Sequence, residues 1–309
     1  MRRTLSILAA LVATLAIAAP VGAITHGVPD NGEHPYVGEL LFYVPDAQDP
    51  RFNTPGGWFT CTGTLMSSTI VVTAGHCTFG IGLNGVSTTH NGADTDAAHG
   101  GLGGNDVWIS FAAAPNFSIL PPSTGFAPGN NAGRYVAWRN ALNASPEWHR
   151  ATATPHPLYN DLAFFVHDAG VLRLAVGNTG ISTFGRLAPT NWLNQYPDNK
   201  KHVFETAGYG LEKSTGSQSI GGDTRRKSDP WLQSLKSSPP NTYMILSNNA
   251  ANGGTCFGDS GGPTFDNTNS RLVVAVTSFG NNNCTGHGGV YRLDQPDDQA
   301  FLAGFGITP

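Results

Sequence analysis

Three short stretches of the sequence carry residues that could act together in nucleophilic catalysis. Ser260 lies within Gly253–Pro263, where flanking glycines allow a sharp turn and leave backbone N–H groups free to face a ligand. A serine hydroxyl becomes a good nucleophile only when a base removes its proton, and that base needs a third group to fix its tautomer. His76, which closes a β-branched stretch beside Cys77, is the candidate base, and Asp161 is the candidate third group.

The order of these three residues in the chain tests whether Ser260 belongs to an α/β-hydrolase. Gly258–Gly262 also fits the G-x-S-x-G pattern of the α/β-hydrolase nucleophile elbow. In that fold the acid and the base follow the serine, but only 49 residues (309 − 260) follow Ser260. This remainder is too short for the acid, the base and the rest of such a sheet. The order His76, Asp161, Ser260 therefore disfavours an esterase or lipase of this type.

Three motifs together resemble the chymotrypsin/trypsin family of serine endopeptidases. They are Thr73-Ala74-Gly75-His76-Cys77, Asn160-Asp161-Leu162-Ala163 and Gly258-Asp259-Ser260-Gly261-Gly262-Pro263. Supporting matches are Gly208-Tyr209-Gly210, Ser278-Phe279-Gly280 and Gly289-Val290-Tyr291. The resemblance implies an all-β fold of two six-stranded antiparallel β-barrels. It also implies a cleft between the barrels in which peptide bonds of polypeptide substrates are hydrolysed through an acyl-enzyme.

The same resemblance implies a role for each residue of the cleft. His76 is expected to act as general base and then as general acid, Asp161 to orient it, and Ser260 to attack the scissile carbonyl. The N–H groups of Gly258 and Ser260 are expected to form the oxyanion hole. Ser278 to Gly280 would offer backbone groups to an extended substrate, as in β-strand addition.

The residues of the implied specificity pocket suggest which side chain it accepts. Gly254 stands where the family has its pocket base and Thr255 follows it, so no carboxylate is present to neutralise a basic P1 side chain. Gly280 and Gly289 on the walls leave room for a large side chain. We therefore expect an apolar or aromatic P1 preference, with an acidic preference as the alternative because His287 lies near this wall.

Asp161 is preferred over other aspartates because of the residues after it. It lies 85 residues (161 − 76) after His76, and Asp94, Asp96 and Asp106 fall within this interval. Only Asp161 heads a strand-like apolar run, Leu-Ala-Phe-Phe, which could carry a carboxylate into the interior. We therefore predict that Asp161 is the partner of His76.

The N-terminus reads as a secretory signal. Arg2 and Arg3 precede an apolar stretch, Leu5–Ala19, that is too short to span a bilayer and is followed by small residues at Val21–Ala23. We expect residues 1–23 to be removed and the mature protein to be secreted, with no membrane attachment. In the family a new N-terminal isoleucine pairs with the aspartate before the serine. The resemblance therefore implies an activation pair of Ile24 and Asp259, although Thr25-His26 replaces the usual Val-Gly.

Four cysteines support this location, because an even number in an exported protein indicates disulfides. Three pairings are open, and the sequence spacing favours Cys61 with Cys77 and Cys256 with Cys284. By the resemblance, the second bridge would brace the walls of the specificity pocket.

These residues need strands to hold them. With 39 glycines, 21 prolines and only 12% charged residues, the composition favours turns and short strands over long helices. We divide the mature chain into an N-terminal barrel of about 24–187, a linker of about 188–200 and a C-terminal barrel of about 201–309, which ends in a short helix, Pro296–Phe305. The strands expected from apolar patterning are Tyr36–Phe42, Trp58–Met66, Thr69–Ala74, Val107–Ala112, Tyr135–Leu142, His202–Ala207, Trp231–Lys236, Thr242–Leu246, Arg271–Phe279 and Gly289–Leu293.

Charge and ligand patterns limit the other partners. The net charge is −4 and no long basic run is present, so nucleic acid is not an expected partner. We expect a monomer without a cofactor or metal. A polar cluster at His90–His99 makes calcium the alternative, but it lacks the glutamate of an EF-hand loop. A non-catalytic binding protein on the same fold remains the alternative function.

Overall fold

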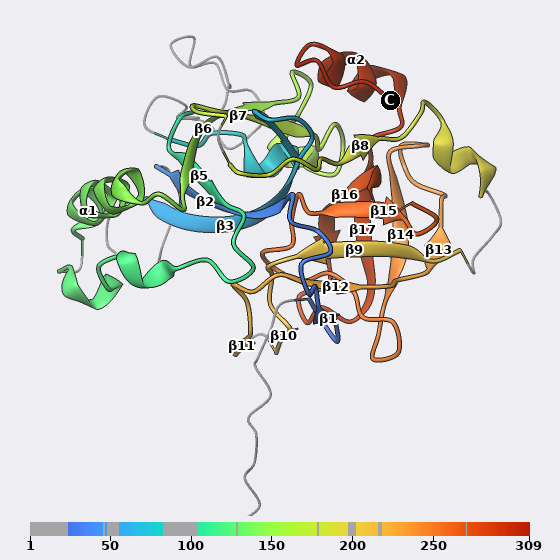
Figure 1. The fold of residues 1–309 in the computed structure, drawn as a ribbon. Helices are drawn as coiled ribbons and strands as arrows, with labels where there is room; N and C mark the ends of the chain where they lie inside the picture. Colours follow the sequence, from blue (N-terminus) through green and yellow to red (C-terminus); the bar gives the residue numbers. More distant parts are fainter. Residues whose placement is uncertain are drawn as a thin grey trace, which may run out of the picture.

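The computed structural model describes residues 24–45, 47, 56–82, 104–127, 129–177, 179–196, 202–215, 218–269 and 271–309. The predicted signal segment 1–23, Asp94, Asp96 and the His90–His99 cluster lie outside these residues. Figure 1 shows that the described chain forms two β structures side by side, with helix α1 (Asn131–Ala144) at the outer edge of one of them and helix α2 (Pro296–Ala303) at the top.

The first β structure is a closed barrel of six antiparallel strands in the order β2-β3-β4-β7-β6-β5. β5 pairs with β2 and so closes the barrel, with Leu40 opposite Ile109. Its interior is filled by apolar side chains such as Val71 and Leu172, which are fully buried. The strands are β2 (Val37–Val44), β3 (Gly57–Leu65), β4 (Ile70–Thr73), β5 (Val107–Ser110), β6 (His149–Pro155) and β7 (Gly170–Leu174).

The second β structure is a curled sheet of nine strands in the order β1-β12-β9-β15-β16-β17-β14-β13, with β8 added in parallel beside β16. A separate hairpin joins β10 and β11. The predicted double-barrel all-β fold is confirmed, although strand pairing curls the second barrel without closing it. These strands are β1 (Val28–Pro29), β8 (Arg186–Leu187), β9 (Phe204–Gly208), β10 (Lys213–Ser214), β11 (Ser219–Ile220), β12 (Arg226–Ser228), β13 (Leu232–Ser234), β14 (Tyr243–Asn248), β15 (Pro263–Asp266), β16 (Leu272–Gly280) and β17 (Gly286–Arg292).

Two segments that precede or follow the first barrel in sequence belong to the second sheet. β1 pairs with β12, and β8 pairs with β16. The predicted boundary at residue 187 differs from this arrangement, because β1 and β8 come before it in the sequence but pair with strands of the second sheet. Side chains of both halves share one apolar cluster, which includes Leu172 and Val276. The two β structures therefore pack against each other through a shared apolar core.

The prediction of a strand over Tyr135–Leu142 is wrong, because this stretch lies inside helix α1. Asn130 caps the helix by accepting the Gly133 N–H at 3.0 Å. The helix packs on the first barrel through an aromatic cluster, where Trp138 lies 5.3 Å from Trp58 between ring centroids. The buried residues recur at helical spacing: Asn131, Arg134, Tyr135 and Leu142.

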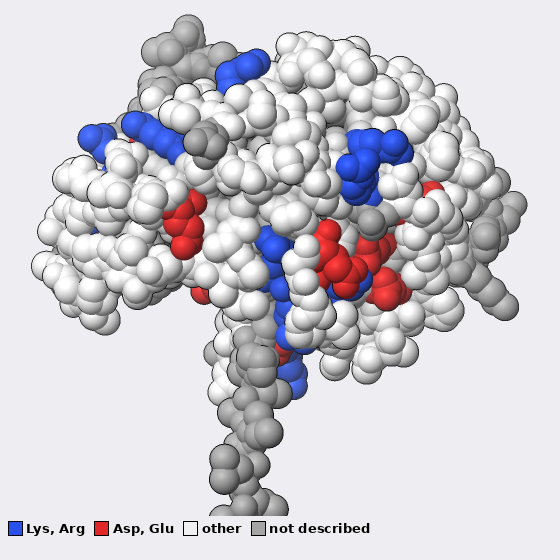
Figure 2. Space-filling model, viewed as in Figure 1, with Lys and Arg blue, Asp and Glu red and all other residues white. Residues whose placement is uncertain are grey.

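The remaining short elements are 3-10 turns, and the C-terminal helix confirms the prediction at the end of the chain. No helix among the described residues is long and apolar enough to cross a membrane. Figure 2 shows one face of the molecule, on which charged groups are sparse and positive and negative side chains lie next to one another near its middle. The 3-10 turns are η1 (Gly75–Cys77), η2 (Phe117–Ile119), η3 (Ser123–Gly125), η4 (Asp161–Ala163) and η5 (Trp192–Gln195).

Candidate active site

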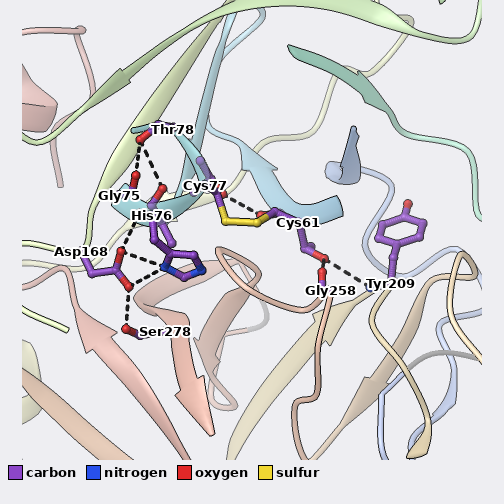
Figure 3. The surroundings of a disulfide bond; sticks show 12 residues. Cys61, Gly75, His76, Cys77, Thr78, Asp168, Tyr209, Gly258 and Ser278 are labelled. Atoms are coloured by element: carbon purple, nitrogen blue, oxygen red, sulfur yellow. Dashed lines mark hydrogen bonds and ion pairs between the residues drawn. A yellow bond between two sulfur atoms is a disulfide. The ribbon is translucent and has the colours of Figure 1, made fainter. Parts of the chain in front are cut away.

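His76 is held at the end of β4 by the short turn η1. The fully buried strand ends at Thr73, and the turn follows directly. The disulfide Cys61–Cys77 ties the turn to β3, with a Cα–Cα distance of 6.3 Å (Figure 3). The predicted pairings Cys61–Cys77 and Cys256–Cys284 are both confirmed. His76 is therefore fixed at its backbone from two sides.

Asp168, which the sequence analysis did not select, is the carboxylate that contacts His76. Nδ1 of His76 lies 3.0 Å from each oxygen of Asp168, and the His76 backbone N–H donates to Oδ1 at 2.9 Å (Figure 3). Ser278 Oγ donates to Oδ2 at 2.5 Å. Burial lowers the pKa of His76, but the Asp168 carboxylate outweighs burial and raises the pKa above its ordinary value of 6.5. This pair can hold the imidazole in one orientation and stabilise its protonated form.

The prediction that Asp161 orients His76 is wrong. Asp161 begins the 3-10 turn η4, in which Asn160 Oδ1 accepts the Leu162 N–H at 2.9 Å. This cap bends the chain, so the run after Asp161 is not a strand and carries no carboxylate inward. Leu162 is 67% exposed, which a buried strand would not allow. Asp106, another aspartate of the interval, bonds to Tyr135 instead.

A sequence signal for Asp168 does exist. Asp168 stands two residues before Gly170–Leu174, which forms β7 with one exposed residue, Arg173, among buried ones. An aspartate ahead of a strand-like apolar run therefore describes Asp168 as well as Asp161. The aromatic run after Asp161 also predicts a strand. In the structure Phe164 and Phe165 do not form one but pack edge-on against Phe279.

Ser260 lies between the two β structures, on a glycine turn that contacts the strand leading to His76. Its carbonyl accepts the Thr62 N–H of β3 at 2.8 Å, and the Gly261 N–H donates to Thr277 O of β16 at 2.8 Å. Gly261 has a φ of +75°, and a Cβ there would lie 1.9 Å from Thr73 Oγ1. Only glycine permits this close approach. Ser260 Oγ makes no hydrogen bond to His76 in the described chain, and such bonds are often long without substrate.

The backbone before Ser260 has the form that an anion-binding turn requires. Gly258 has a φ of +98°, and a Cβ there would lie 2.8 Å from the Gly210 Cα. Thr62 Oγ1 donates to the Gly258 carbonyl at 2.9 Å and fixes the peptide. Among the described backbone groups, neither the Gly258 nor the Ser260 N–H has an acceptor. Two donors next to one hydroxyl can stabilise an oxyanion.

A pocket of about 220 Å³ opens beside Ser260 and contains three of the five predicted specificity residues. Thr255, Ser278 and Gly280 line it, and a Cβ on Gly280 would meet nothing within 4 Å. No carboxylate lines this pocket in the described chain. Its lining residues are Phe164, Thr255, Cys256, Phe257, Ser260, Thr277, Ser278, Phe279, Gly280, Asn281 and Cys284.

The predictions that Gly254 and Gly289 line this pocket are wrong. Gly254 is buried behind it and exchanges two hydrogen bonds of 3.0 Å with Thr25, while a Cβ there would lie 2.4 Å from Asn248. Gly289 is covered by the ring of Phe279, whose nearest atom would lie 2.2 Å from its Cβ. The alternative residue for this wall, His287, is exposed on β17. The pocket wall is therefore formed by Phe279 and not by Gly289.

Comparison with known protein families agrees with this geometry. The family model described as Trypsin matches residues 137–294, which are 158 of the 309 residues (294 − 137 + 1). The chain belongs to the trypsin family. The matched segment contains Asp168 and Ser260 and begins after His76, so the assignment of His76 depends on the structure and the sequence motif.

Comparison with solved structures supports the fold of this trypsin-family chain. The protein HBP, solved at atomic resolution, is 15% identical and superimposes with a TM-score of 0.54, covering 93% of this chain and 98% of its own. This likeness bears on the fold alone. Comparison with curated proteins finds no match.

Ile24 and Asp259, the predicted activation pair, both form hydrogen bonds with Gly210 in the trypsin-family fold. Ile24 is fully buried, and its backbone nitrogen donates to Gly210 O at 3.2 Å. The Gly210 N–H donates to Asp259 Oδ1 at 2.8 Å, and the Cys256 N–H donates to Oδ2 at 2.8 Å. Burial raises the pKa of Asp259 to about 7, although these two N–H donors act to lower it. This carboxylate has no cation paired with it in the described chain.

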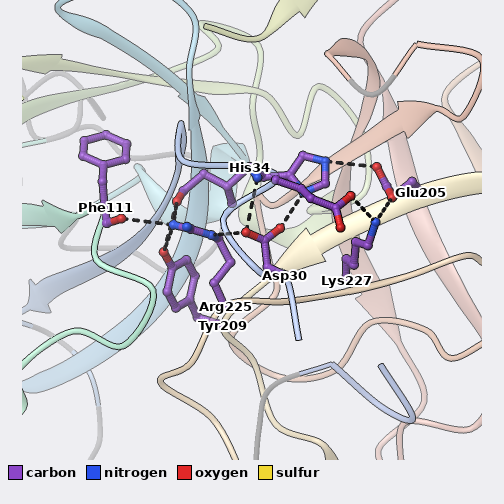
Figure 4. Close-up of polar contacts among 9 residues, drawn as sticks. Asp30, His34, Phe111, Glu205, Tyr209, Arg225 and Lys227 are labelled. Carbon is purple, nitrogen blue, oxygen red and sulfur yellow. Dashed lines mark hydrogen bonds and ion pairs between the residues drawn. The ribbon is translucent and has the colours of Figure 1, made fainter. Parts of the chain in front are cut away.

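A buried group of ion pairs holds the N-terminal segment against the second sheet (Figure 4). His34 lies between two carboxylates, with Nδ1 2.6 Å from Asp30 and Nε2 3.0 Å from Glu205. Arg225 Nε donates to Asp30 at 2.9 Å, and Lys227 donates to Glu205 at 2.9 Å. We call these five residues the junction cluster. It anchors the segment that leads from Ile24 into the first barrel.

Proposed function

We propose that this trypsin-family chain is a secreted serine endopeptidase that cleaves polypeptides through an acyl-enzyme. The observation that carries the proposal is the bonding of His76 Nδ1 to the buried Asp168, with Ser260 on a glycine turn at the same cleft. Two disulfides are consistent with an extracellular location.

In this mechanism Asp168 keeps Nδ1 of His76 protonated, so that Nε2 can accept the Ser260 proton as Oγ attacks the carbonyl. The N–H groups of Gly258 and Ser260 then stabilise the oxyanion. Protonated His76 next donates its proton to the leaving amine, and a water molecule repeats the sequence to hydrolyse the acyl-enzyme. Ser278 contributes by bonding to Asp168 and so fixing its rotamer.

An apolar or aromatic P1 preference follows from the pocket beside Ser260. Its lining combines the rings of Phe164, Phe257 and Phe279 with backbone and hydroxyl groups, and it has room at Gly280. A lysine or arginine side chain would lose hydration there without meeting a counter-charge. We expect phenylalanine, tyrosine or leucine at P1 to be preferred over arginine or lysine.

Activation by removal of the signal segment is the second part of the proposal. Ile24 has a φ of +63°, which is strained for a β-branched residue in an uncleaved chain. Cleavage before Ile24 would release this constraint and create an ammonium group next to Asp259. The new ion pair would order the turn that carries Gly258. N-terminal sequencing of the mature protein should begin at Ile24.

Cleavage-site profiling on a peptide library tests the activity and the P1 preference together. The purified mature protein should cleave internal peptide bonds, and Ser260→Ala should abolish cleavage without changing the melting temperature. A binding protein on the same fold would cleave nothing. An esterase would hydrolyse simple esters and leave the library intact.

A further inference from the structure

Asp168 stands at the end of a loop that is closed at its base. The loop begins at His156, after β6, and returns at Ala169, where the His156 N–H donates to Ala169 O at 2.8 Å. The imidazole rings of His156 and His167 stack at this base, with centroids 4.9 Å apart and planes within 9°. Burial and the neighbouring His167 lower the pKa of His156, so its ring stacks in the neutral form.

The residue before Asp168 adopts a conformation that the loop must maintain. His167 has a φ of +53°, in the left-handed region that non-glycine residues adopt at a cost of about 1–3 kcal/mol. The Ala169 N–H donates to His167 O at 2.8 Å, which places Asp168 in the middle of a tight three-residue turn. The direction of the Asp168 carboxylate therefore depends on His167 keeping this conformation.

The C-terminal helix contacts both histidines. His167 Nδ1 lies 3.1 Å from Oδ2 of Asp297, in the first turn of α2. One turn further on, Phe301 packs edge-on against His156 with centroids 5.0 Å apart.

We propose that the His167–Asp297 pair, supported by His156 and Phe301, is a clamp through which the C-terminal helix aims Asp168 at His76. The inference rests on the proposed function, because the orientation of Asp168 matters for proton transfer. His167 and Asp297 make no contact with His76 or Ser260 in the described chain, so they are positioning residues.

The same three side chains, His156, His167 and Asp297, also lie close enough together to hold a metal ion. However, the partners of His156 argue against this use. Its Nδ1 accepts the Leu158 N–H at 3.2 Å. A metal at this nitrogen would have to displace that bond. Parallel stacking also prevents the two rings from directing lone pairs at one ion.

The clamp makes a prediction about the pH dependence of catalysis. Asp168 raises the pKa of His76, so a carboxylate that moves away would lower that pKa and shift the acidic limb of kcat/KM to lower pH. A mutation that merely destabilised the fold would reduce the amplitude of the profile without moving this limb. Ser278 donates a hydrogen bond to Asp168 but does not titrate in this range. The titratable groups around Asp168 and its clamp are His76, Tyr159, His167, Tyr291, Asp297 and Asp298.

Two variants separate the clamp from direct electrostatics. Asp297→Asn removes the pairing charge without touching the loop, and His167→Gly keeps the left-handed backbone but removes the ring. We expect each to lower kcat about 10-fold with little change in KM, and to shift the acidic limb to lower pH. Through direct electrostatics alone, loss of the His167 ring would leave the pKa of His76 unchanged or raise it. A lower pKa of His76 in His167→Gly therefore reports the lost clamp. Asp297→Glu should restore most of the activity.

Two controls complete the experiment. Glu33→Gln removes a half-exposed carboxylate from an ion pair with Lys227 and should change neither kcat nor the limb. Titration of the His76 ring by NMR in Ser260→Ala protein measures the clamp without turnover. A wild-type protein without peptidase activity would refute the proposed function but leave this titration valid. Unchanged His76 titration and unchanged kcat in both variants would overturn the clamp, as would zinc inhibition that is lost in His167→Gly.

Discussion

His34 and His76 are both paired with buried carboxylates, in different parts of the molecule. His34, in the junction cluster, has carboxylates at both ring nitrogens, 2.6 Å and 3.0 Å away, and its side chain is 0% exposed. His76 has a carboxylate only at Nδ1, and 24% of its side chain is exposed. Its Nε2 has no hydrogen-bond partner among the described residues.

This difference shows what distinguishes a structural histidine from a chemical one. Carboxylates raise the pKa of both rings above 6.5, against the effect of burial. His34 has no nitrogen left with which to accept a proton from a substrate or a nucleophile. His76 keeps one, and it lies at a cleft with Ser260. The free nitrogen, and not the shifted pKa, makes His76 the candidate base.

Replacing the carboxylate of the cleft should have the largest effect. Asp168→Asn keeps the size of the side chain but favours the wrong imidazole tautomer, and we expect kcat to fall about 10⁴-fold. The melting temperature should change little. Steady-state cleavage of the best library peptide measures this, and Asp161→Asn is the matched control that should retain full activity. Equal losses in both variants would contradict the assignment of Asp168.

Breaking the junction cluster should affect stability and not chemistry. His34→Gln removes the cation between Asp30 and Glu205. Both carboxylates keep a second cationic partner, so we expect the unfolding free energy to fall by about 1–3 kcal/mol. Denaturant unfolding measures this loss, and kcat of the folded fraction should remain unchanged. Glu33→Gln, at a half-exposed ion pair, should cost no more than about 1 kcal/mol.

The two histidines should respond to pH in opposite directions. His34 has a folded pKa above its unfolded value of 6.5, so its stabilisation is complete below pH 6.5 and is lost as the pH rises through the folded pKa. Activity should instead rise as His76 loses its proton over a similar range. Above pH 6.5 the parent should lose stability faster than His34→Gln, by up to about 1.4 kcal/mol per pH unit. Parallel stability curves would contradict the charged state of His34.

A smaller effect is expected at Ser278. Ser278→Ala removes the hydroxyl that donates to Asp168 Oδ2, and we expect kcat to fall about 10-fold because the carboxylate loses one of its anchors. Ser278→Thr keeps the hydroxyl and should recover most of the rate. A loss that appears only in KM would indicate instead that Ser278 acts through substrate binding.

The sequence predicted the parts of the molecule that repeat a local pattern. Alternating apolar residues identified most strands of both barrels, and glycines around Ser260 identified the turn, since Gly258 and Gly261 both need positive φ. Helix α1 is the exception, because its aromatic residues favour a strand in the sequence. The cap at Asn130 and packing on the first barrel make it a helix.

The partner of His76 could not be chosen from local pattern alone. Asp161 and Asp168 both precede apolar residues, and only the tertiary fold decides which run becomes a barrel strand. The phenylalanines after Asp161 pack against Phe279 of the other β structure, a contact that no short-range signal encodes. The same applies to Gly254, which the N-terminal segment covers by pairing with Thr25.

Active-site labelling tests the central claim most directly. The mature protein is treated with a fluorophosphonate, and the modified peptide is identified by mass spectrometry. We predict one adduct, on Ser260, that forms much more slowly in Asp168→Asn and at the parent rate in Asp161→Asn. An unlabelled Ser260 in folded mature protein would contradict the proposal that this chain is a serine endopeptidase.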